Sequence, residues 1–178
     1  MTADDVAEIL DRLDAAGIWY CVEGGWGVDA LLGEQTRPHD DLDLGVRMGD
    51  VERICNALGE FGRSDIEWPG SFVLRDGGVR KLDAHPLRFD ENGDGWQRKQ
   101  DGREYRWPGD QLDARGVIGG RDVRCITPEL QLQWHEHDGF DDVDWADMRA
   151  LAARFGLAFA RRRPGLIARK RTRRPAER

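Results

Sequence analysis

Two aspartates one residue apart, Asp41 and Asp43, have a type and spacing that could do chemistry. Residues 41–47 alternate polar and apolar side chains, which predicts a strand with both carboxylates on one face, ~6.6 Å apart along it. Close carboxylates repel each other, and a cation between them removes that repulsion. Mg²⁺ accepts such oxygen ligands together with substrate phosphates. By itself, the pair is more typical of an exposed sheet face than of a metal site.

Gly24 and Gly25 precede the aspartates, at a predicted junction between a strand over 18–22 and a short helix over 26–33. Without Cβ atoms, backbone N–H groups there can approach a phosphate closely, and the helix N-terminus adds a favourable dipole. A tight turn with positive φ would need the same glycines. No GKS or GKT sequence follows, which excludes a Walker-type phosphate loop.

Asp83 is a third carboxylate, on the second strand of a hairpin predicted over 71–89 with its turn at Gly77–Gly78. If that strand lies beside 41–47, three aspartates converge on one face. Such a set is typical of two-metal phosphoryl or nucleotidyl transfer, in which the ions lie ~3.5–4 Å apart. Asp83 could then also take the proton from an attacking hydroxyl as a general base.

The elements that must position these residues follow from hydrophobic periodicity and from start and stop signals. Thr2 is the expected N-cap of the first helix, and Thr127 with Pro128 marks a later helix start. The region 97–115 is too polar and too rich in Trp and Pro to assign. The order indicates an α+β fold with a mixed sheet and a helical C-terminal part. Besides the segments above, we expect helices over 3–16 and 50–61, a hairpin over 116–126, and helices from Pro128 and over 142–156.

The charge of the chain is unevenly distributed. The net charge is −7 over 178 residues, yet residues 161–178 carry nine Lys and Arg against one Glu. The acidic remainder would repel a nucleic-acid backbone and attract cationic small molecules or metal ions. For the tail, a solvated and disordered terminus is the first interpretation. The alternatives are a contact with RNA or with the acidic body of a neighbouring subunit, as in a homodimer.

The location expected from sequence is the cytoplasm. No apolar run approaches the ~18 residues that span a bilayer, and residues 1–10 lack the pattern of a signal peptide. The three cysteines, Cys21, Cys55 and Cys125, are scattered and lack CxxC spacing. This pattern favours reduced thiols over disulfides or a zinc site, and we expect no membrane partner.

Taken together, G-G-W, a short helix, D-L-D and an Asp on a later strand resemble the DNA polymerase β-like nucleotidyltransferase superfamily. Within it, "GGWGVDALLGEQTRPHDDLDL" is most similar to the small antibiotic nucleotidyltransferases, those of the lincosamide type and those that modify the double-primed ring of aminoglycosides. The likeness continues through "LDAHP", "NGDG", "RDVRCITPELQLQWH" and "DDVDWADMRAL", and covers most of residues 1–156.

The resemblance implies a nucleotidyltransferase fold that moves a nucleoside monophosphate, usually AMP from Mg-ATP, to a hydroxyl of a small molecule and releases pyrophosphate. It implies that Asp41 and Asp43 bind two Mg²⁺ ions, and that Asp83 completes the second metal site and acts as the base. The domain boundaries that we expect are a catalytic domain over 1–126, a helical part over 127–160 that closes the cleft, and the basic tail over 161–178.

Further site residues are expected on the same resemblance. The turn at Gly24, Gly25 and Trp26 would hold the triphosphate of ATP or another nucleoside triphosphate, and Arg37 and His39 would contact phosphate or hydroxyl groups. For the acceptor, we expect contacts from the side chains of His85, Trp96, Trp107 and His135. Each of these four has a plainer alternative: a polar neighbour for His85, core packing for the tryptophans, and a helix surface for His135.

The acceptor and the class of function stay open at this point. The acidic body favours a cationic acceptor such as an aminoglycoside, whereas "LDAHP" and "NGDG" resemble the lincosamide branch. One alternative function is a non-catalytic regulatory or antitoxin-like nucleotide-binding protein, against which the three aspartates count. Another is an enzyme that adenylylates a protein or an RNA end, and the acidic body counts against RNA.

Overall fold

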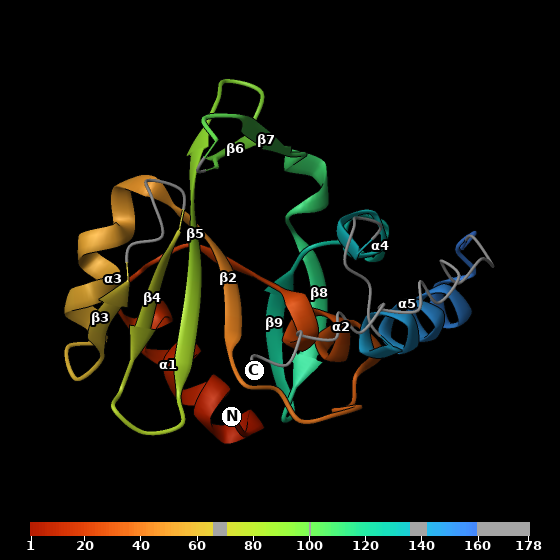
Figure 1. The fold of residues 1–178 in the computed structure, drawn as a ribbon, viewed down its shortest axis with the longest axis horizontal. Coiled ribbons are helices and arrows are strands. Elements are labelled where there is room, and N and C mark those ends of the chain that lie inside the picture. The colour runs from red at the N-terminus through yellow and green to blue at the C-terminus, as the bar shows by residue number, and fades with distance from the viewer. Residues whose placement is uncertain (66–70, 100, 136–141, 160–178) are drawn as a thin grey trace, which may run out of the picture.

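The computed structural model describes residues 1–65, 71–99, 101–135 and 142–159 (Figure 1). Its elements in chain order are α1 Ala3–Ala15, β1 Tyr20–Glu23, α2 Gly24–Leu32, β2 Leu42–Arg47, η1 Met48–Asp50, α3 Val51–Ala57, β3 Gly62–Asp65, β4 Phe72–Arg75, β5 Lys81–Phe89, β6 Gly95–Arg98, β7 Glu104–Trp107, η3 Gly109–Gln111, β8 Ala114–Ile118, β9 Arg121–Cys125, α4 Pro128–His135 and α5 Asp142–Phe155.

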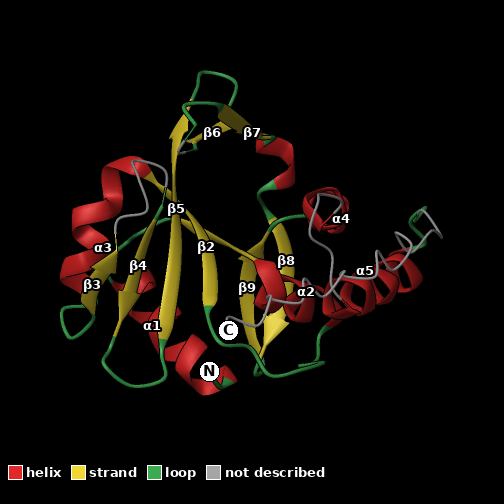
Figure 2. Ribbon diagram, viewed as in Figure 1, coloured by secondary structure: helices red, strands yellow, loops and turns green. Residues whose placement is uncertain are grey.

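One mixed sheet organises these elements, in the strand order β3-β4-β5-β2-β1-β9-β8, with β6 and β7 extending from the end of β5. The pairs β2–β5 and β1–β9 are parallel, and the other pairs along this order are antiparallel. Figure 2 shows α2, α4 and α5 together on the β8–β9 side, and α3 beside β3 and β4. The predicted mixed sheet flanked by helices is therefore confirmed.

Helix α1 forms as its sequence predicts. Thr2 is the N-cap, and its side chain and that of Asp5 each accept a hydrogen bond from the other residue's backbone N–H. The apolar positions at helical spacing are fully buried, each contributing on the order of 1.5–3 kcal/mol. They are Val6, Ile9, Leu10 and Leu13.

The second helix differs from its prediction at the start. We expected it over 26–33, but α2 begins at Gly24, directly after β1. Gly24 has φ +59°, a left-handed conformation that glycine adopts without a steric penalty, so strand turns into helix within one residue. Gly33, with φ +80°, ends α2 as expected.

Elements with weak local signals were missed or misjudged in length. The helix expected over 50–61 stops at Ala57, because Leu58 leaves helical dihedrals and a tight turn follows, although Leu58 and Phe61 are still buried. Strand β3 was not predicted. The unassigned region 97–115 contains β7, which buries only Trp107 and therefore has no clear alternation.

The core holds two clusters of buried side chains. The larger contains Leu42 and Leu44, both fully buried on the face opposite the aspartates, as predicted. The smaller consists of Cys21, Leu87, Trp107, Leu112, Ile126 and Leu130. Within the described ranges, none of the helices combines the length and the apolar character required to cross a bilayer.

Candidate active site

The sheet register brings carboxylates from three strands into one row. Strand β2 lies between β1 and β5, with Asp43 opposite Glu23 on one side and opposite Asp83 on the other. Asp41 directly precedes β2. The pairing of the Asp83 strand with the Asp43 strand, on which the convergence of the aspartates depended, is present, and Glu23 is a fourth carboxylate that sequence reasoning missed.

Strand β5 adds two nitrogen-bearing side chains to this face, because Lys81, Asp83 and His85 alternate with buried residues. The Lys81 Nζ atom lies 2.6 Å from Asp41 Oδ2 and 3.8 Å from Asp83 Oδ2. Lys81 was also missed, although its position two residues before Asp83 was a signal that could have found it.

His85 lies at the other end of the row. Its Nε2 atom is 3.5 Å from Glu23 Oε1, 3.8 Å from Asp83 Oδ1 and 4.0 Å from Asp43 Oδ1. Its Nδ1 atom lies 2.9 Å from the amide nitrogen of Gln97, a buried residue of β6. Gln97 therefore orients the imidazole toward the carboxylates, a role that no local sequence pattern predicts.

The residues of this row fit a divalent cation. Asp43, Asp83 and His85 each offer a ligand atom, and these atoms lie within 4.8 Å of one another. Ligands bound at ~2.1 Å stand ~3–4.2 Å apart, so small side-chain movements suffice to close the set on an ion. Among the described residues, Asp83 Oδ1 and Glu23 Oε1 are buried without a hydrogen-bond partner. Buried polar atoms need a partner, and a bound cation would provide one for both oxygens.

Burial and mutual repulsion shift the protonation of the row. Burial raises the pKa of Glu23 to about 7, and the charges of Asp43 and Asp83 act in the same direction. Burial likewise raises the pKa of Asp83. Burial alone would lower the pKa of His85, but the surrounding carboxylates outweigh it and raise that pKa. A cation bound among these groups would favour the ionised carboxylates.

The glycine pair brings the start of α2 against the acidic row. A Cβ atom on Gly24 would overlap the Asp43 carboxylate, and one on Gly25 would overlap the His39 ring. The Gly24 carbonyl accepts a hydrogen bond from the Gln131 amide of α4, at 3.2 Å. Only glycine therefore permits this approach of a helix N-terminus, a site suited to phosphate, to the acidic row.

Arg37, His39 and Trp26 support this junction. His39 is buried, with Nε2 bonded to Asp29 Oδ2 and its ring 4.7 Å from the Trp26 ring. The Arg37 guanidinium, about one third exposed, donates to Asp147 Oδ2 of α5 at 2.9 Å. Trp26 itself is 2% exposed. The loop before Asp41 is thus held by α2 on one side and by α5 on the other.

The other expected acceptor residues are not gathered in one place. Trp96 lies on β6, half-buried, and its indole N–H donates to Asp90 Oδ2 at 2.8 Å. Trp107 is 2% exposed and packs against Trp134 in the smaller core cluster, with ring centroids 4.2 Å apart. His135 is the last residue of α4, and its side chain lies outside the described part of the chain.

Comparison with known proteins identifies relatives over most of the chain. The family model described as aminoglycoside-2''-adenylyltransferase matches residues 5–151. A lincosamide resistance protein of Staphylococcus haemolyticus is 28% identical over 153 residues, covering 85% of this chain and 94% of the relative. A 2''-aminoglycoside nucleotidyltransferase of Escherichia coli is 33% identical over 147 residues, covering 79% of this chain and 77% of the relative.

Solved structures show the same fold. The lincosamide antibiotic adenylyltransferase LnuA, crystallised with lincomycin bound, superposes with a TM-score of 0.76 at 26% identity and covers 86% of this chain and 98% of its own. The crystal structure of ANT(2'')-Ia in complex with adenylyl-2''-tobramycin gives a TM-score of 0.65 at 24% identity, with 85% of this chain and 88% of the other covered. At that identity the second likeness concerns the fold alone.

Proposed function

Because this chain belongs to the aminoglycoside-2''-adenylyltransferase family, we propose that it transfers AMP from Mg-ATP to a hydroxyl of a lincosamide or aminoglycoside antibiotic and releases pyrophosphate. The observation that carries the proposal is the register that aligns Asp43 with Asp83, with Asp41 directly before the strand. We further propose that the reaction takes place in the cytoplasm, which the free cysteines and the use of ATP support.

In this proposal Asp41, Asp43 and Asp83 hold two Mg²⁺ ions. Such ions, when bound, neutralise the developing charge on the transferred phosphoryl group and orient the attacking hydroxyl. The chain itself binds and aligns the reactants and moves the proton. Asp83, whose pKa is raised by burial, accepts the proton of the acceptor hydroxyl.

The nucleotide lies against the start of α2 in this proposal. Gly24 and Gly25 let the first N–H groups of α2 reach the triphosphate, and the helix dipole favours its negative charge. Arg37 supplies a positive charge at the exposed end of its guanidinium. Trp26 and His39 are both buried and support the start of α2 by packing.

The helical part over 127–160 completes the cleft. Gln131 of α4 donates a hydrogen bond to the carbonyl of Gly24, and Asp147 of α5 pairs with Arg37. Both helices therefore contact the proposed nucleotide site of the 1–126 domain. The acceptor would lie between this part and the end of β5, near His85, with the Trp107 ring packed against the His85 ring. The basic tail, 161–178, lies outside the described residues, and we propose for it a role outside catalysis, as a contact with an acidic partner or a second subunit.

The acceptor is the part to be tested directly. Purified protein is incubated with Mg-ATP and a panel of lincosamides and aminoglycosides, and pyrophosphate release is followed together with a mass gain of one AMP on the drug. We expect Asp83→Asn to reduce turnover by at least about 10³-fold with an unchanged melting temperature. The matched control is Asp122→Asn, an exposed strand carboxylate on β9.

Two outcomes would contradict the proposal. If no drug in the panel gains AMP although the protein binds the nucleotide tightly, the result would favour a regulatory nucleotide-binding protein. Undiminished transfer by Asp83→Asn would remove this carboxylate from the mechanism.

A further inference from the structure

The Lys81 ammonium group lies between two carboxylates that the proposed function uses for metal binding. It is 2.6 Å from Asp41 Oδ2 and 3.8 Å from Asp83 Oδ2. The Lys81 Nζ atom donates a hydrogen bond to Asp41 Oδ2, so the ammonium group is a positive charge already in place at one end of the acidic row.

The two carboxylate oxygens of Asp83 face two different positions in the acidic row. Its Oδ2 atom faces Lys81, whereas its Oδ1 atom is buried, lacks a hydrogen-bond partner among the described residues, and lies 3.8 Å from His85 Nε2. Asp43 Oδ1 closes the Oδ1 side, 4.0 Å from the same nitrogen. The row thus offers two cation positions, of which the Asp41 side is filled by an ammonium group and the Asp43 side is not.

We propose that Lys81 occupies the second metal position in the nucleotide-free protein, so that the chain alone binds one divalent ion, at Asp43, Asp83 and His85. A second ion binds only when the Lys81–Asp41 ion pair opens. This inference rests on the proposed function, because it concerns the same carboxylates. Phosphate oxygens of the nucleotide offer the additional ligands that make the exchange favourable, and the released ammonium can pair with a phosphate.

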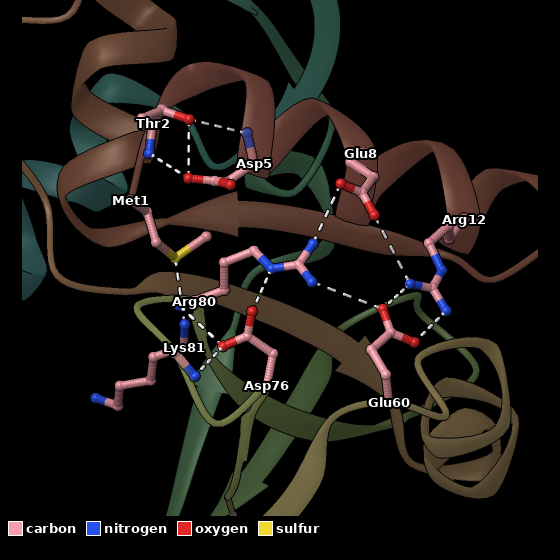
Figure 3. A network of polar contacts seen from close by, with 10 residues as sticks. Met1, Thr2, Asp5, Glu8, Arg12, Glu60, Asp76, Arg80 and Lys81 are labelled. Atoms are coloured by element: carbon pink, nitrogen blue, oxygen red, sulfur yellow. Dashed lines mark hydrogen bonds and ion pairs between the residues drawn. The ribbon is translucent and has the colours of Figure 1, made fainter.

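The surroundings of Lys81 allow this exchange without a backbone movement. The Lys81 N–H donates to Met1 Sδ at 3.4 Å, and the neighbouring Arg80 is bonded to Asp76 and to Glu8 (Figure 3). In that view the Lys81 side chain extends away from this network. Because the start of β5 is fixed through Arg80, rotation of the Lys81 side chain alone vacates the position.

The test counts metal ions in the absence of nucleotide. Mn²⁺ is titrated into the full chain, and free Mn²⁺ is followed by electron paramagnetic resonance. We expect one tightly bound ion in the wild type and in Lys81→Arg, which keeps the charge. In Lys81→Met we expect two, the second bound about fivefold tighter or more than any second ion of the wild type. Arg115→Met, which removes an exposed positive charge from β8, is the matched control and should bind one.

Two tight ions in the wild type, or an unchanged single ion in a folded Lys81→Met protein, would overturn the assignment. Melting temperatures establish that each variant is folded. The drug panel separates this result from the proposed function. If the ion counts follow the expectation but no drug gains AMP, the acceptor is wrong and the role of Lys81 stands. If the wild type binds two ions and still transfers AMP, only the role of Lys81 falls.

Discussion

At the scale of single residues, the site consists of ionisable side chains that lie close together and are largely shielded from solvent. Glu23 is only 12% exposed and stands beside Asp43 in the sheet, so its ionisation is costly without a cation. The neighbouring His85 offsets part of that cost. The protonation of Glu23 therefore reports on whether the row holds a cation.

The pH dependence of stability follows from this carboxylate. Its pKa rises from 4.5 to about 7 on folding, so between these values the native state holds a proton that the unfolded chain has released. Stability is therefore lost as the pH rises through this window. Glu23→Gln stays neutral, so in a chelator it should match the wild type near pH 4, below the pKa of the unfolded chain. Near pH 8 it should be more stable by up to ~3 kcal/mol.

Urea unfolding at the two pH values measures this difference. Glu91→Gln, an exposed turn residue, serves as the control and should parallel the wild type. An equal pH dependence in wild type and Glu23→Gln would show that Glu23 ionises normally. Saturating Mg²⁺ should reduce the difference at pH 8, because the ion favours the charged carboxylates.

At the scale of elements, the site depends on contacts between segments far apart in the chain. Arg37 stands in the loop before β2, and its partner Asp147 is a buried residue of α5. The loop is also anchored by Thr36, whose hydroxyl donates to Asp29 Oδ1 at 2.6 Å. Helix α5 therefore helps to set where Arg37 lies relative to the start of α2.

Asp147→Asn tests this coupling. The substitution removes the charge that holds the guanidinium, and we expect a loss of roughly 1–3 kcal/mol in unfolding free energy. If Arg37 contacts the triphosphate, KM for ATP should rise several-fold while KM for the antibiotic changes little. Steady-state kinetics and urea unfolding measure both effects. Asp142→Asn, an exposed carboxylate at the start of the same helix, is the control. A KM for ATP equal to that of the wild type would confine Asp147 to a structural role.

At the scale of the whole molecule, we expect charge to select among acceptors. The net charge is −7 although the last 18 residues are strongly basic, so the folded body is more acidic than the total suggests. Such a body attracts polycations over distances of about a Debye length, ~8–10 Å at physiological salt. A polycationic aminoglycoside would benefit more from this attraction than a lincosamide with a single amine.

Ionic strength separates the two acceptor types. If an aminoglycoside is the substrate, its KM should rise several-fold between 50 and 300 mM salt, on the order expected for screening of a multiply charged ligand. The KM for a lincosamide should change by less than about twofold. Deleting residues 161–178 should steepen the aminoglycoside dependence, because the remaining chain is more acidic. Equal salt dependence for both drug types would exclude long-range attraction as the basis of selection.

The sequence by itself determined what local patterns control. The Thr2 cap and the buried positions of α1 follow from helical spacing, and Leu42 and Leu44 point to the core because side chains alternate along a strand. The glycines before α2 were recognisable because φ > 0 and close approach both exclude a Cβ atom. Asp43 and Asp83 could be assigned to a face because side chains alternate along their strands, and Asp41 directly precedes the first of these strands.

Only the tertiary structure decided which strands are neighbours and in what register. Lys81 and Asp41 are 40 residues apart, and Gln97 reaches His85 from a strand that branches off the main sheet, so no local period encodes either contact. Trp107 lies in a polar segment yet is buried, because β7 folds back over the smaller core cluster. Strand pairing joins residues distant in sequence through backbone hydrogen bonds that are alike at every position, and the partner is therefore selected by the packing of the whole sheet.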